Sequence, residues 1–366
     1  MREKILIAGG GTGGHVYPAI ATIEALREKG DFTFLFVGGK KGMEMNIIPK
    51  YNIASESIWI SGFQRYFTWK NFLFPMKLLV GMLQSRKIIK NFNPDVVVGT
   101  GGYVTGPVLY TASKMGIPVL IQEQDVFPGV TTRLLKKHAN RICLAFDGAR
   151  QYFKDYLNKI VITGNPVRKN LTLKSKAEGI EKWNLTPEKP VIFVFGGSQG
   201  ARAINTALIA IIPKLIKEYG VQILWQTGEK NYASIEESEI DYEEVKILPF
   251  IQEIDYAYSA ADIIVSRAGA ITLAELAIVQ KPVILVPYPF AAGKHQEHNA
   301  KLIEQEGAAI MLLEERGWEE KLLNTIIKLL EDQLLRSKMM EAWRKLSRPN
   351  AANIIADEVI NLINKN

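Results

Sequence analysis

Short apolar runs alternate with longer amphipathic stretches along the first half of the chain, and glycine-rich turns separate them. An apolar run at residues 4–8 leads through Gly9–Gly14 into a helical pattern at residues 18–29, and another apolar run covers residues 32–37. The remaining strands of this half are predicted at residues 95–98, 118–121, 141–145 and 160–163. Because strands that alternate with helices after glycine-rich turns are typical of parallel sheets, the pattern predicts an α/β fold.

The second half of the chain begins the same pattern again. Residues 190–195 form an apolar run, residues 196–200 a glycine-rich turn and residues 201–218 a helical pattern. Further strands are predicted at residues 221–226, 245–248, 262–266, 283–286 and 308–312. The turn residues Gly164–Pro166 follow a predicted strand, so the boundary between two domains is predicted there. Residues 351–363 are predicted to form an amphipathic helix.

Length and composition agree with two globular domains. The chain has 366 residues, of which 47% are hydrophobic and 23% charged, and these values exclude a disordered or collagen-like chain. A single cysteine, Cys143, excludes a disulfide scaffold and a cysteine-rich zinc site, and it fits a reducing compartment. No apolar run reaches the roughly 18 residues that a membrane-spanning helix needs, and the first residues do not match a signal peptide.

Positive charge is concentrated in the first half of the chain. Residues 1–164 contain 21 Lys and Arg against 11 Asp and Glu, whereas residues 165–366 contain 24 against 27. Residues 57–94 contain six cations interleaved with aromatic side chains, and no acidic residue. Such segments are typical of helices that lie on anionic membranes, which favours a membrane over a nucleic acid; the alternative is a core helix with a solvated basic rim. The candidate membrane patch consists of Trp69, Lys70, Phe72, Phe74 and Lys77.

The first glycine-rich turn has the spacing of a nucleotide-binding loop. Gly9, Gly11 and Gly14 lie between a predicted strand and a predicted helix, where glycine lets the backbone approach a ligand and the helix N-terminus attracts anions. A dinucleotide site also needs an acidic residue at the end of the second strand, where it binds the ribose. That strand ends at Gly38 and Gly39, so binding of NAD is disfavoured.

Three further glycine-rich turns follow predicted strands, at residues 99–103, 196–200 and 266–270. Ligands bind at the carboxyl ends of strands in such sheets, so the turns predict a cleft with one substrate bound by each half. In the second half, Arg267 is a candidate partner for a phosphate, and Ser198 lies where a helix N-terminus would hold a diphosphate. Glu275 is either a ligand for ribose hydroxyls or, together with Thr272, part of a helix capping box.

Two histidines open another predicted helix in the second half. His295 and His298 are spaced for one helix face, but no third metal ligand is near them in the sequence. Hydrogen bonding to sugar hydroxyls is therefore favoured over metal binding for this segment.

Six motifs follow one another in the order that they have in one bacterial family. They are Gly10–Ala19, Gly101–Pro107, Gly164–Arg168, Gly196–Ala201, Arg267–Glu275 and His295–Ala300. Over residues 4–360 the chain closely resembles the MurG family, the bacterial UDP-N-acetylglucosamine (UDP-GlcNAc):lipid I N-acetylglucosaminyltransferases, which make lipid II. The resemblance implies a GT-B glycosyltransferase fold, in which two Rossmann-like domains face each other across a cleft. It also implies a first domain at residues 1–164 with a C-terminal helix at about 345–366, a second domain at 165–344, and membrane docking by the basic segment.

The same resemblance implies which residues bind the two substrates. Glu275 would hold the ribose of the donor UDP-GlcNAc, Ser198 and Arg267 would lie at its diphosphate, and the backbone at Ile251 would read uracil. The implied donor site consists of Thr12, Gly13, Gly14, Arg168, Ser198, Ile251, Arg267, Ala270, Glu275, His295 and Gln296. The implied acceptor site consists of Gly11, Thr12, Gly13, Gly14, His15, Gly101, Gly102, Tyr103 and Asp125.

The implied reaction is an inverting attack by the C4 hydroxyl of N-acetylmuramic acid (MurNAc) on the anomeric carbon of GlcNAc. His15 is the candidate general base; alternatively it only hydrogen-bonds the acceptor phosphate or the loop, and Asp125 is a second candidate base. The chain departs from the usual His-Glu-Gln-Asn of the family at Gln122–Asp125, and His295 stands where some relatives have Gln. No Asp-x-Asp motif occurs, so no metal cofactor is expected, and helix N-termini with Arg267 are expected to stabilise the leaving UDP.

The expected partners are UDP-GlcNAc, lipid I, an anionic membrane surface and other cell-wall synthesis proteins. The expected location is peripheral, on the cytoplasmic face of the bacterial inner membrane. Four other functions stay open at this point: a related GT-B transferase with another lipid acceptor, a two-domain sugar epimerase, an NAD-dependent oxidoreductase and a membrane scaffold.

Overall fold

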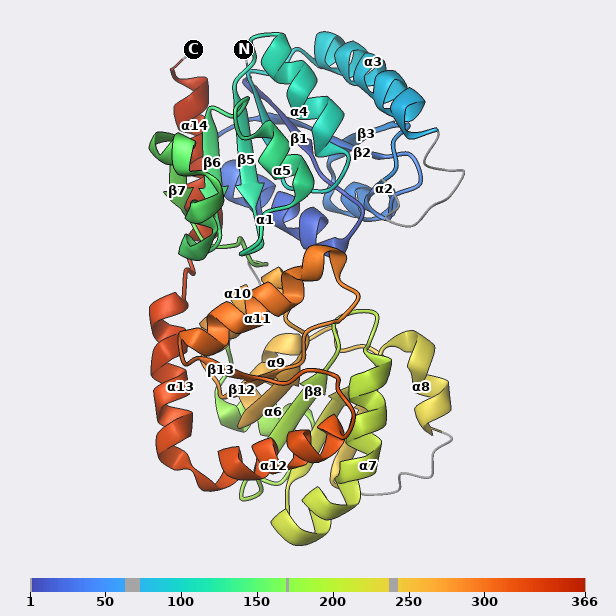
Figure 1. The fold of residues 1–366 in the computed structure, drawn as a ribbon, viewed down its shortest axis with the longest axis vertical. Coiled ribbons are helices and arrows are strands. Elements are labelled where there is room, and N and C mark those ends of the chain that lie inside the picture. Colours follow the sequence, from blue (N-terminus) through green and yellow to red (C-terminus); the bar gives the residue numbers. More distant parts are fainter. Residues whose placement is uncertain (1, 63–72, 169–170, 237–242, 366) are drawn as a thin grey trace. The chain divides into compact units, whose positions relative to one another are not determined.

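The computed structural model describes residues 2–62, 73–168, 171–236 and 243–365 (Figure 1). The chain forms two compact units. Unit 1 consists of Met1–Arg168 with Arg348–Asn366, and unit 2 consists of Lys169–Ser347. Of the predicted membrane-patch residues, Trp69, Lys70 and Phe72 lie outside the described residues. Among the helices within the described ranges, none has both the length and the apolar character needed to cross a membrane.

Unit 1 is built on a seven-stranded sheet in which all neighbouring strands are parallel. The strands lie in the order β3-β2-β1-β4-β5-β6-β7. Their bounds are β1 Lys4–Ala8, β2 Thr33–Gly39, β3 Ala54–Ile58, β4 Val96–Gly99, β5 Val119–Glu123, β6 Arg141–Leu144 and β7 Ile160–Ile162. The helices of this unit are α1 Gly13–Lys29, α2 Glu44–Ile47, α3 Phe74–Phe92, α4 Thr105–Lys114, α5 Val130–Leu135 and α14 Ala351–Ile363.

Helices cover both faces of this sheet, because successive side chains of a strand point to opposite faces. Leu6 and Ala8 of β1 belong to a core that includes buried residues of α3, α4 and α5. Ile5 and Ile7 belong to a second core, on the side of α1 and α14. Helix α14 therefore lies against α1 in unit 1, although the 179 residues of unit 2 separate it in sequence from β7 (Figure 1).

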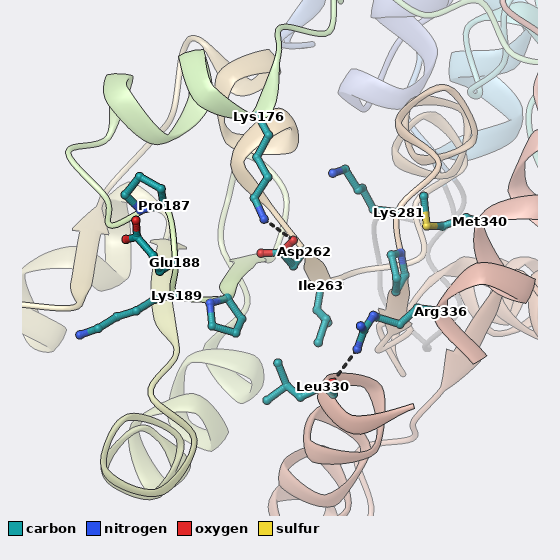
Figure 2. Close-up of a pocket in the computed structure, with 12 residues that line it drawn as sticks. Lys176, Pro187, Glu188, Lys189, Asp262, Ile263, Lys281, Leu330, Arg336 and Met340 are labelled. Atoms are coloured by element: carbon teal, nitrogen blue, oxygen red, sulfur yellow. Dashed lines mark hydrogen bonds and ion pairs between the residues drawn. The ribbon is translucent and has the colours of Figure 1, made fainter. Parts of the chain in front are cut away.

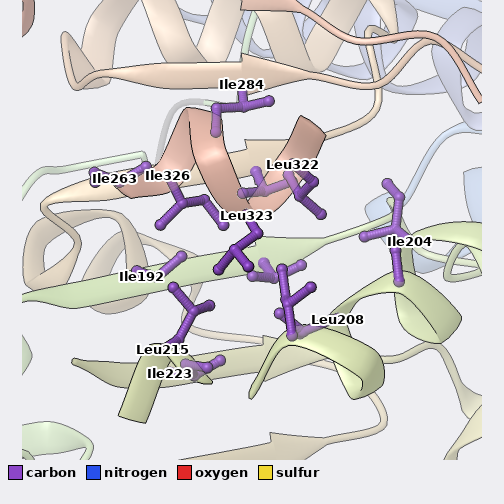
Figure 3. Packing of buried hydrophobic residues seen from close by; sticks show 14 of the residues in the cluster. Ile192, Ile204, Leu208, Leu215, Ile223, Ile263, Ile284, Leu322, Leu323 and Ile326 are labelled. Atoms are coloured by element: carbon purple, nitrogen blue, oxygen red, sulfur yellow. The ribbon is translucent and has the colours of Figure 1, made fainter. Parts of the chain in front are cut away.

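Unit 2 repeats this architecture with six parallel strands in the order β10-β9-β8-β11-β12-β13. The strands are β8 Val191–Phe195, β9 Gln222–Gln226, β10 Val245–Leu248, β11 Ile263–Ser266, β12 Val283–Leu285 and β13 Ala309–Met311. The helices are α6 Lys176–Lys182, α7 Arg202–Tyr219, α8 Glu229–Glu236, α9 Ile254–Ala260, α10 Ala270–Val279, α11 His295–Gln305, α12 Trp318–Glu331 and α13 Gln333–Leu346. Aliphatic side chains of α7 and α12 pack on one face of this sheet, as Figure 3 shows for Leu208, Ile326 and their neighbours.

Strand order reverses once in each sheet, and the glycine-rich turns follow the strands on either side of the reversal. In unit 1 the chain runs outward from β1 to β3 on one side and from β4 to β7 on the other, so the reversal lies between β1 and β4. In unit 2 the reversal lies between β8 and β11. The four glycine-rich turns, at residues 9–14, 99–103, 196–200 and 266–270, follow these four strands. Open α/β sheets bind their ligands at such reversals, outside the carboxyl ends of the strands.

The predicted fold of two Rossmann-like α/β domains is confirmed, and two local predictions need correction. Helix α1 begins at Gly13 and contains Pro18, whereas the prediction began this helix at the proline. Strand β3 was not predicted, because its sequence Ala54–Ile58 is polar and only its last residue is buried. This strand lies at the edge of the sheet, where most of its side chains stay exposed or half-buried and need not be apolar.

Candidate functional site

A buried carboxylate forms a hydrogen bond with the loop after β1. Glu44 of α2 is fully buried, and its two oxygens accept hydrogen bonds from the backbone N–H groups of Gly11 at 3.1 Å and Gly39 at 2.8 Å. A Cβ atom at Gly10 or Gly42 would overlap this carboxylate. Glu44 therefore joins the loops after β1 and β2, and it could not be predicted because no sequence motif marks an isolated acid in a short helix.

His15 lies in the first turn of α1, and its side chain contacts the same loop. Its Nδ1 atom is 2.9 Å from the carbonyl oxygen of Gly10 and 3.3 Å from Thr12 Oγ1. A carbonyl only accepts, so Nδ1 carries the proton in this contact, and Nε2 is then the unprotonated nitrogen of the neutral ring. The Thr100 hydroxyl donates to the backbone carbonyl of His15 at 2.8 Å, which ties α1 to the loop after β4.

In the loop after β4, two glycines lie against the His15 ring. Gly101 and Gly102 have φ angles of +102° and +85°, and a Cβ atom at Gly101 would lie within 2.9 Å of His15 Nε2. The ring of Tyr103 lies over Gly11, and burial together with the nearby Glu44 raises the pKa of Tyr103. The structure thus gathers the loop, histidine and tyrosine members of the predicted acceptor site at one reversal point.

The loop after β5 adds a network of buried amides beside these groups. Gln124 donates to the carbonyl of Thr100 at 2.5 Å and also contacts Gln122, which donates to Asn165 at 2.9 Å. Asn165 in turn donates to the carbonyl of Gln124 at 3.0 Å. Asp125 follows directly and is half-buried. The amide network therefore fixes the backbone on which Asp125 stands.

Glu123 is the buried acid of this loop. It accepts hydrogen bonds from the backbone N–H groups of Asp125 and Gly129, each at 3.2 Å. Burial, and then the charge of Asp125, raises the pKa of Glu123 from 4.5 to about 7. Its charge state therefore changes close to neutral pH, next to the predicted acceptor residue Asp125.

In unit 2, the loop after β8 presents Ser198 to solvent ahead of α7. Gly197 and Gly200 flank it with φ angles of +85° and +72°, and the N–H of Gly200 donates to the carbonyl of Gly197 at 3.0 Å. Ala201 is the N-cap of α7 and makes no side-chain capping bond. Ala201 therefore provides no side-chain acceptor for the backbone N–H groups in the first turn of α7. Uncapped N–H groups at a helix N-terminus can bind a phosphate.

Glu275 does not cap its helix. Helix α10 begins at Ala270 with Gly269 as its N-cap, so Glu275 is the sixth helical residue and lies beyond the first turn. Its side chain is buried and accepts a hydrogen bond from the hydroxyl of Tyr258 at 3.0 Å. The capping-box interpretation is therefore wrong, and Tyr258 is a partner that the sequence did not indicate.

Arg267 is buried at the end of β11 and has several partners. Its guanidinium donates to the carbonyls of Val286 at 3.1 Å and Pro287 at 3.3 Å, and it forms an ion pair with Glu314. The guanidinium also lies 5.4 Å from the centre of the Tyr288 ring. Glu314 is 47 residues away in sequence, so its pairing with Arg267 could not be predicted from a local motif.

The other predicted donor residues lie at the start of α11, in the loop at Ile251 and in unit 1. His295 and Gln296 open α11, where His295 Nδ1 is 2.7 Å from the carbonyl of Ala292 and Gln296 accepts from the N–H of Tyr288 at 2.9 Å. Ile251 is buried, and its N–H donates to Gln226 at 2.8 Å. Arg168 is exposed and belongs to unit 1, as do Thr12, Gly13 and Gly14.

A cavity of about 330 Å³ in unit 2 lies elsewhere (Figure 2). Pro190, Asp262 and Pro282 line it, and each directly precedes a strand, so the cavity is at the amino ends of the strands. Lys176 crosses it to form an ion pair with Asp262 at 2.6 Å. The glycine-rich turns lie at the opposite, carboxyl ends, so this cavity is separate from the predicted donor site.

Comparisons with known proteins point to one family over almost the whole chain. The glycosyltransferase family 28 N-terminal domain matches residues 5–144, and the glycosyltransferase family 28 C-terminal domain matches residues 191–355. A Christiangramia forsetii protein named UDP-N-acetylglucosamine–N-acetylmuramyl-(pentapeptide) pyrophosphoryl-undecaprenol N-acetylglucosamine transferase is 42% identical over 364 residues, 99% of this chain and 98% of that protein. A Clostridioides difficile protein of the same name is 39% identical over 99% of this chain and 89% of its own length.

Solved structures agree with these matches. The crystal structure of MurG from Acinetobacter baumannii has a TM-score of 0.78 and 29% identity, and the match covers 98% of this chain and 99% of that one. A UDP-GlcNAc 2-epimerase from Neisseria meningitidis has a TM-score of 0.67 at 16% identity, which shows a shared fold alone.

The raised pKa of Glu123 leads to a prediction about stability. Between pH 4.5 and about 7 the folded chain keeps a proton that the unfolded chain releases, so stability falls as pH rises through this range. We expect Glu123→Gln, which cannot ionise, to gain about 3 kcal/mol relative to the natural chain between acidic and mildly alkaline pH. Urea unfolding of both proteins across this range measures the gain, and a stability difference that stays constant with pH would contradict it.

Proposed function

Because this chain belongs to glycosyltransferase family 28, we propose that it transfers GlcNAc from UDP-GlcNAc to the C4 hydroxyl of MurNAc in lipid I. The product is lipid II, the precursor used in peptidoglycan synthesis. The observation that carries the proposal is the 42% identity, over nearly the full length of both chains, to a transferase named for this reaction. The glycine-rich turns at both strand-order reversals supply a binding position for each of the two substrates.

In this proposal unit 2 binds the donor. The loop containing Ser198 and the first turn of α7 bind the diphosphate, and the buried carboxylate of Glu275 accepts hydrogen bonds from the ribose. The Tyr258 hydroxyl holds one oxygen of Glu275 and so fixes the direction in which the carboxylate points. Arg267 stabilises the β-phosphate electrostatically, and His295 and Gln296 contact the sugar from the start of α11.

Unit 1 binds the acceptor. The N–H groups at the start of α1 and the loop at Gly101 and Gly102 bind its diphosphate. His15 takes the proton of the C4 hydroxyl at Nε2 while the oxygen bonds to the anomeric carbon and the bond to UDP breaks. The Gly10 carbonyl at Nδ1 fixes the tautomer that this role requires. Attack opposite to the leaving UDP converts the α linkage of the donor into a β linkage.

The leaving UDP gains negative charge, and helix N-termini with Arg267 are proposed to stabilise it without a metal ion. Glu314 pairs with Arg267 and lowers the net positive charge at this position. The contribution of Arg267 therefore depends on how far its guanidinium turns from Glu314 toward the phosphate.

We place the membrane contact of this enzyme on helix α3. Met76, Leu79 and Leu83 are exposed at i, i+3 and i+7, and Arg86 and Lys90 continue the same stripe. Near this stripe a groove of about 480 Å³ is lined mostly by apolar side chains of α3 and of α4 with its C-cap. The lining also contains one threonine and two cations; it consists of Leu79, Met82, Leu83, Arg86, Tyr110, Thr111, Lys114 and Met115. An apolar stripe that continues into cations fits the boundary between acyl chains and anionic headgroups. The enzyme would thus act at the cytoplasmic face of the inner membrane, where lipid I is available.

Activity in the presence of a chelator tests the reaction and its metal independence together. Purified protein, UDP-GlcNAc and a short-chain lipid I analogue are incubated in EDTA, and mass spectrometry detects the product. We expect one added HexNAc and an equal amount of UDP. Activity that disappears in EDTA and returns with magnesium would contradict metal independence. No transfer with or without magnesium, by folded protein that binds UDP-GlcNAc, would contradict the proposed acceptor.

Substitution of His15 tests the general base. His15→Ala is expected to lower kcat by about 100-fold or more, because the C4 hydroxyl then loses its proton acceptor, while the KM for UDP-GlcNAc stays near that of the natural chain. Asp125→Asn serves as the matched comparison. Normal turnover by His15→Ala, or a rise in the acceptor KM with kcat unchanged, would contradict the assignment.

Exposed leucines of α3 test the membrane contact. The double substitution Leu79→Ser and Leu83→Ser is expected to weaken binding to phosphatidylglycerol vesicles by about tenfold or more, since two apolar side chains no longer enter the bilayer. Leu334→Ser is the control, because Leu334 is an equally exposed leucine at 65% on α13 of unit 2. Co-sedimentation with vesicles measures the effect, and equal binding by the double variant and the control would exclude this face.

A further inference from the structure

Gln226, the last residue of β9, connects two loops of the predicted donor site. Only 2% of its surface is exposed. Its Nε2 atom donates to the carbonyl of Gly197 at 3.0 Å, and its Oε1 atom accepts from the N–H of Ile251 at 2.8 Å. One amide therefore holds the glycine-rich loop next to Ser198 with one end and the loop at Ile251 with the other.

The residues that follow Gln226 press against the same glycine-rich loop. Gly200 has φ +72°, and a Cβ atom there would overlap the carbonyl of Thr227. Gly228 has φ +85°, and a Cβ atom there would lie 2.5 Å from the carbonyl oxygen of Gln199. The two loops are thus packed backbone to backbone, and a small displacement of one is transmitted to the other.

This segment is itself held rigidly. Asn205 of α7 donates to the carbonyl of Thr227 at 3.0 Å and accepts from the indole N–H of Trp225 at 3.0 Å. On the other side, the N–H of Thr227 donates to the carbonyl of Leu248 at 3.0 Å, and that of Gly228 to Pro249 at 3.0 Å. Gln226 therefore projects from a fixed backbone, and its two ends set the positions of the loops that they touch.

We propose that Gln226 is a positioning residue for the nucleotide, which sets the spacing between the loop at the diphosphate and the loop at the base. The inference rests on the proposed function, because it concerns the binding of UDP-GlcNAc. Gln226 does not touch the nucleotide in this assignment; it acts through Gly197 and Ile251. Its amide is suited to the task because it donates to a carbonyl at one end and accepts from an N–H at the other.

The same strand offers a matched control. Gln222, the first residue of β9, is 3% exposed, accepts from the N–H of Thr186 at 2.6 Å and donates to its carbonyl at 2.8 Å. It makes the same kind of amide-to-backbone contacts, but at the amino end of the strand, away from the glycine-rich turns. Loss of either amide costs hydrogen bonds of similar strength, so only their positions distinguish the two residues.

Calorimetric titration of UDP-GlcNAc into the full-length chain tests the proposal. We expect Gln226→Met to weaken binding by about tenfold, while Gln222→Met binds like the natural chain although both variants lower the melting temperature. Binding by Gln226→Met with the natural Kd would show that its amide only stabilises the fold, and would overturn the inference. Absence of UDP-GlcNAc binding by the natural chain would instead overturn the proposed function.

A second variant gives a readout that a purely structural role does not produce. Gln226→Glu retains an acceptor for the Ile251 N–H, but when ionised it turns a carboxylate toward the Gly197 carbonyl. Protonation restores the donor, so we expect weak binding at about pH 8 that recovers toward the natural affinity at about pH 5. A ratio of variant to natural Kd that stays constant with pH would overturn the proposal, and this measurement remains possible if Gln226→Met fails to fold.

Discussion

The reversal of strand order in each parallel sheet is the constraint on which the rest of this structure depends. Parallel crossovers on the two sides of such a reversal carry the chain to opposite faces of the sheet, so the loops after β1 and β4, and after β8 and β11, lead to helices on opposite faces. Three of the four loops contain at least three glycines each, and the loop after β11 contains Gly269. Such loops let the backbone come close to a ligand, and each of the helices α1, α7 and α10 begins at the end of one of these loops, within its own unit.

Glycine-rich loops have few side chains of their own that could stabilise them. In both units, buried polar side chains from neighbouring segments form hydrogen bonds with these loops. Glu44 joins the loops after β1 and β2, and Gln226 joins the loop after β8 to the loop at Ile251. Each of these side chains makes two hydrogen bonds to backbone groups, and in each pair one of the bonded residues, Gly39 or Ile251, is buried.

Much of the fold could be predicted because its signals are local. The apolar runs, the glycine turns and the α14 helix are properties of neighbouring residues, and the strands that they predicted are present within one or two residues. Strand β3 was missed because an edge strand needs little apolar cover. Arg267 and Glu275 could be proposed as site residues from local motifs, but their contacts with Glu314 and Tyr258 could not be predicted, since residues 47 and 17 positions apart carry no joint pattern in one sequence.

The sequence by itself therefore determined the α/β class, the two halves, the four glycine-rich turns and the family, because each depends on residue type and spacing along the chain. Only the tertiary structure decided which turns share a reversal point, that Glu275 lies inside α10 rather than at its N-terminus, and which ring nitrogen of His15 faces the Gly10 carbonyl. These features depend on strand order, on where a helix begins and on contacts between distant segments. Such contacts are chosen by the packing of the whole unit, and no local pattern encodes them.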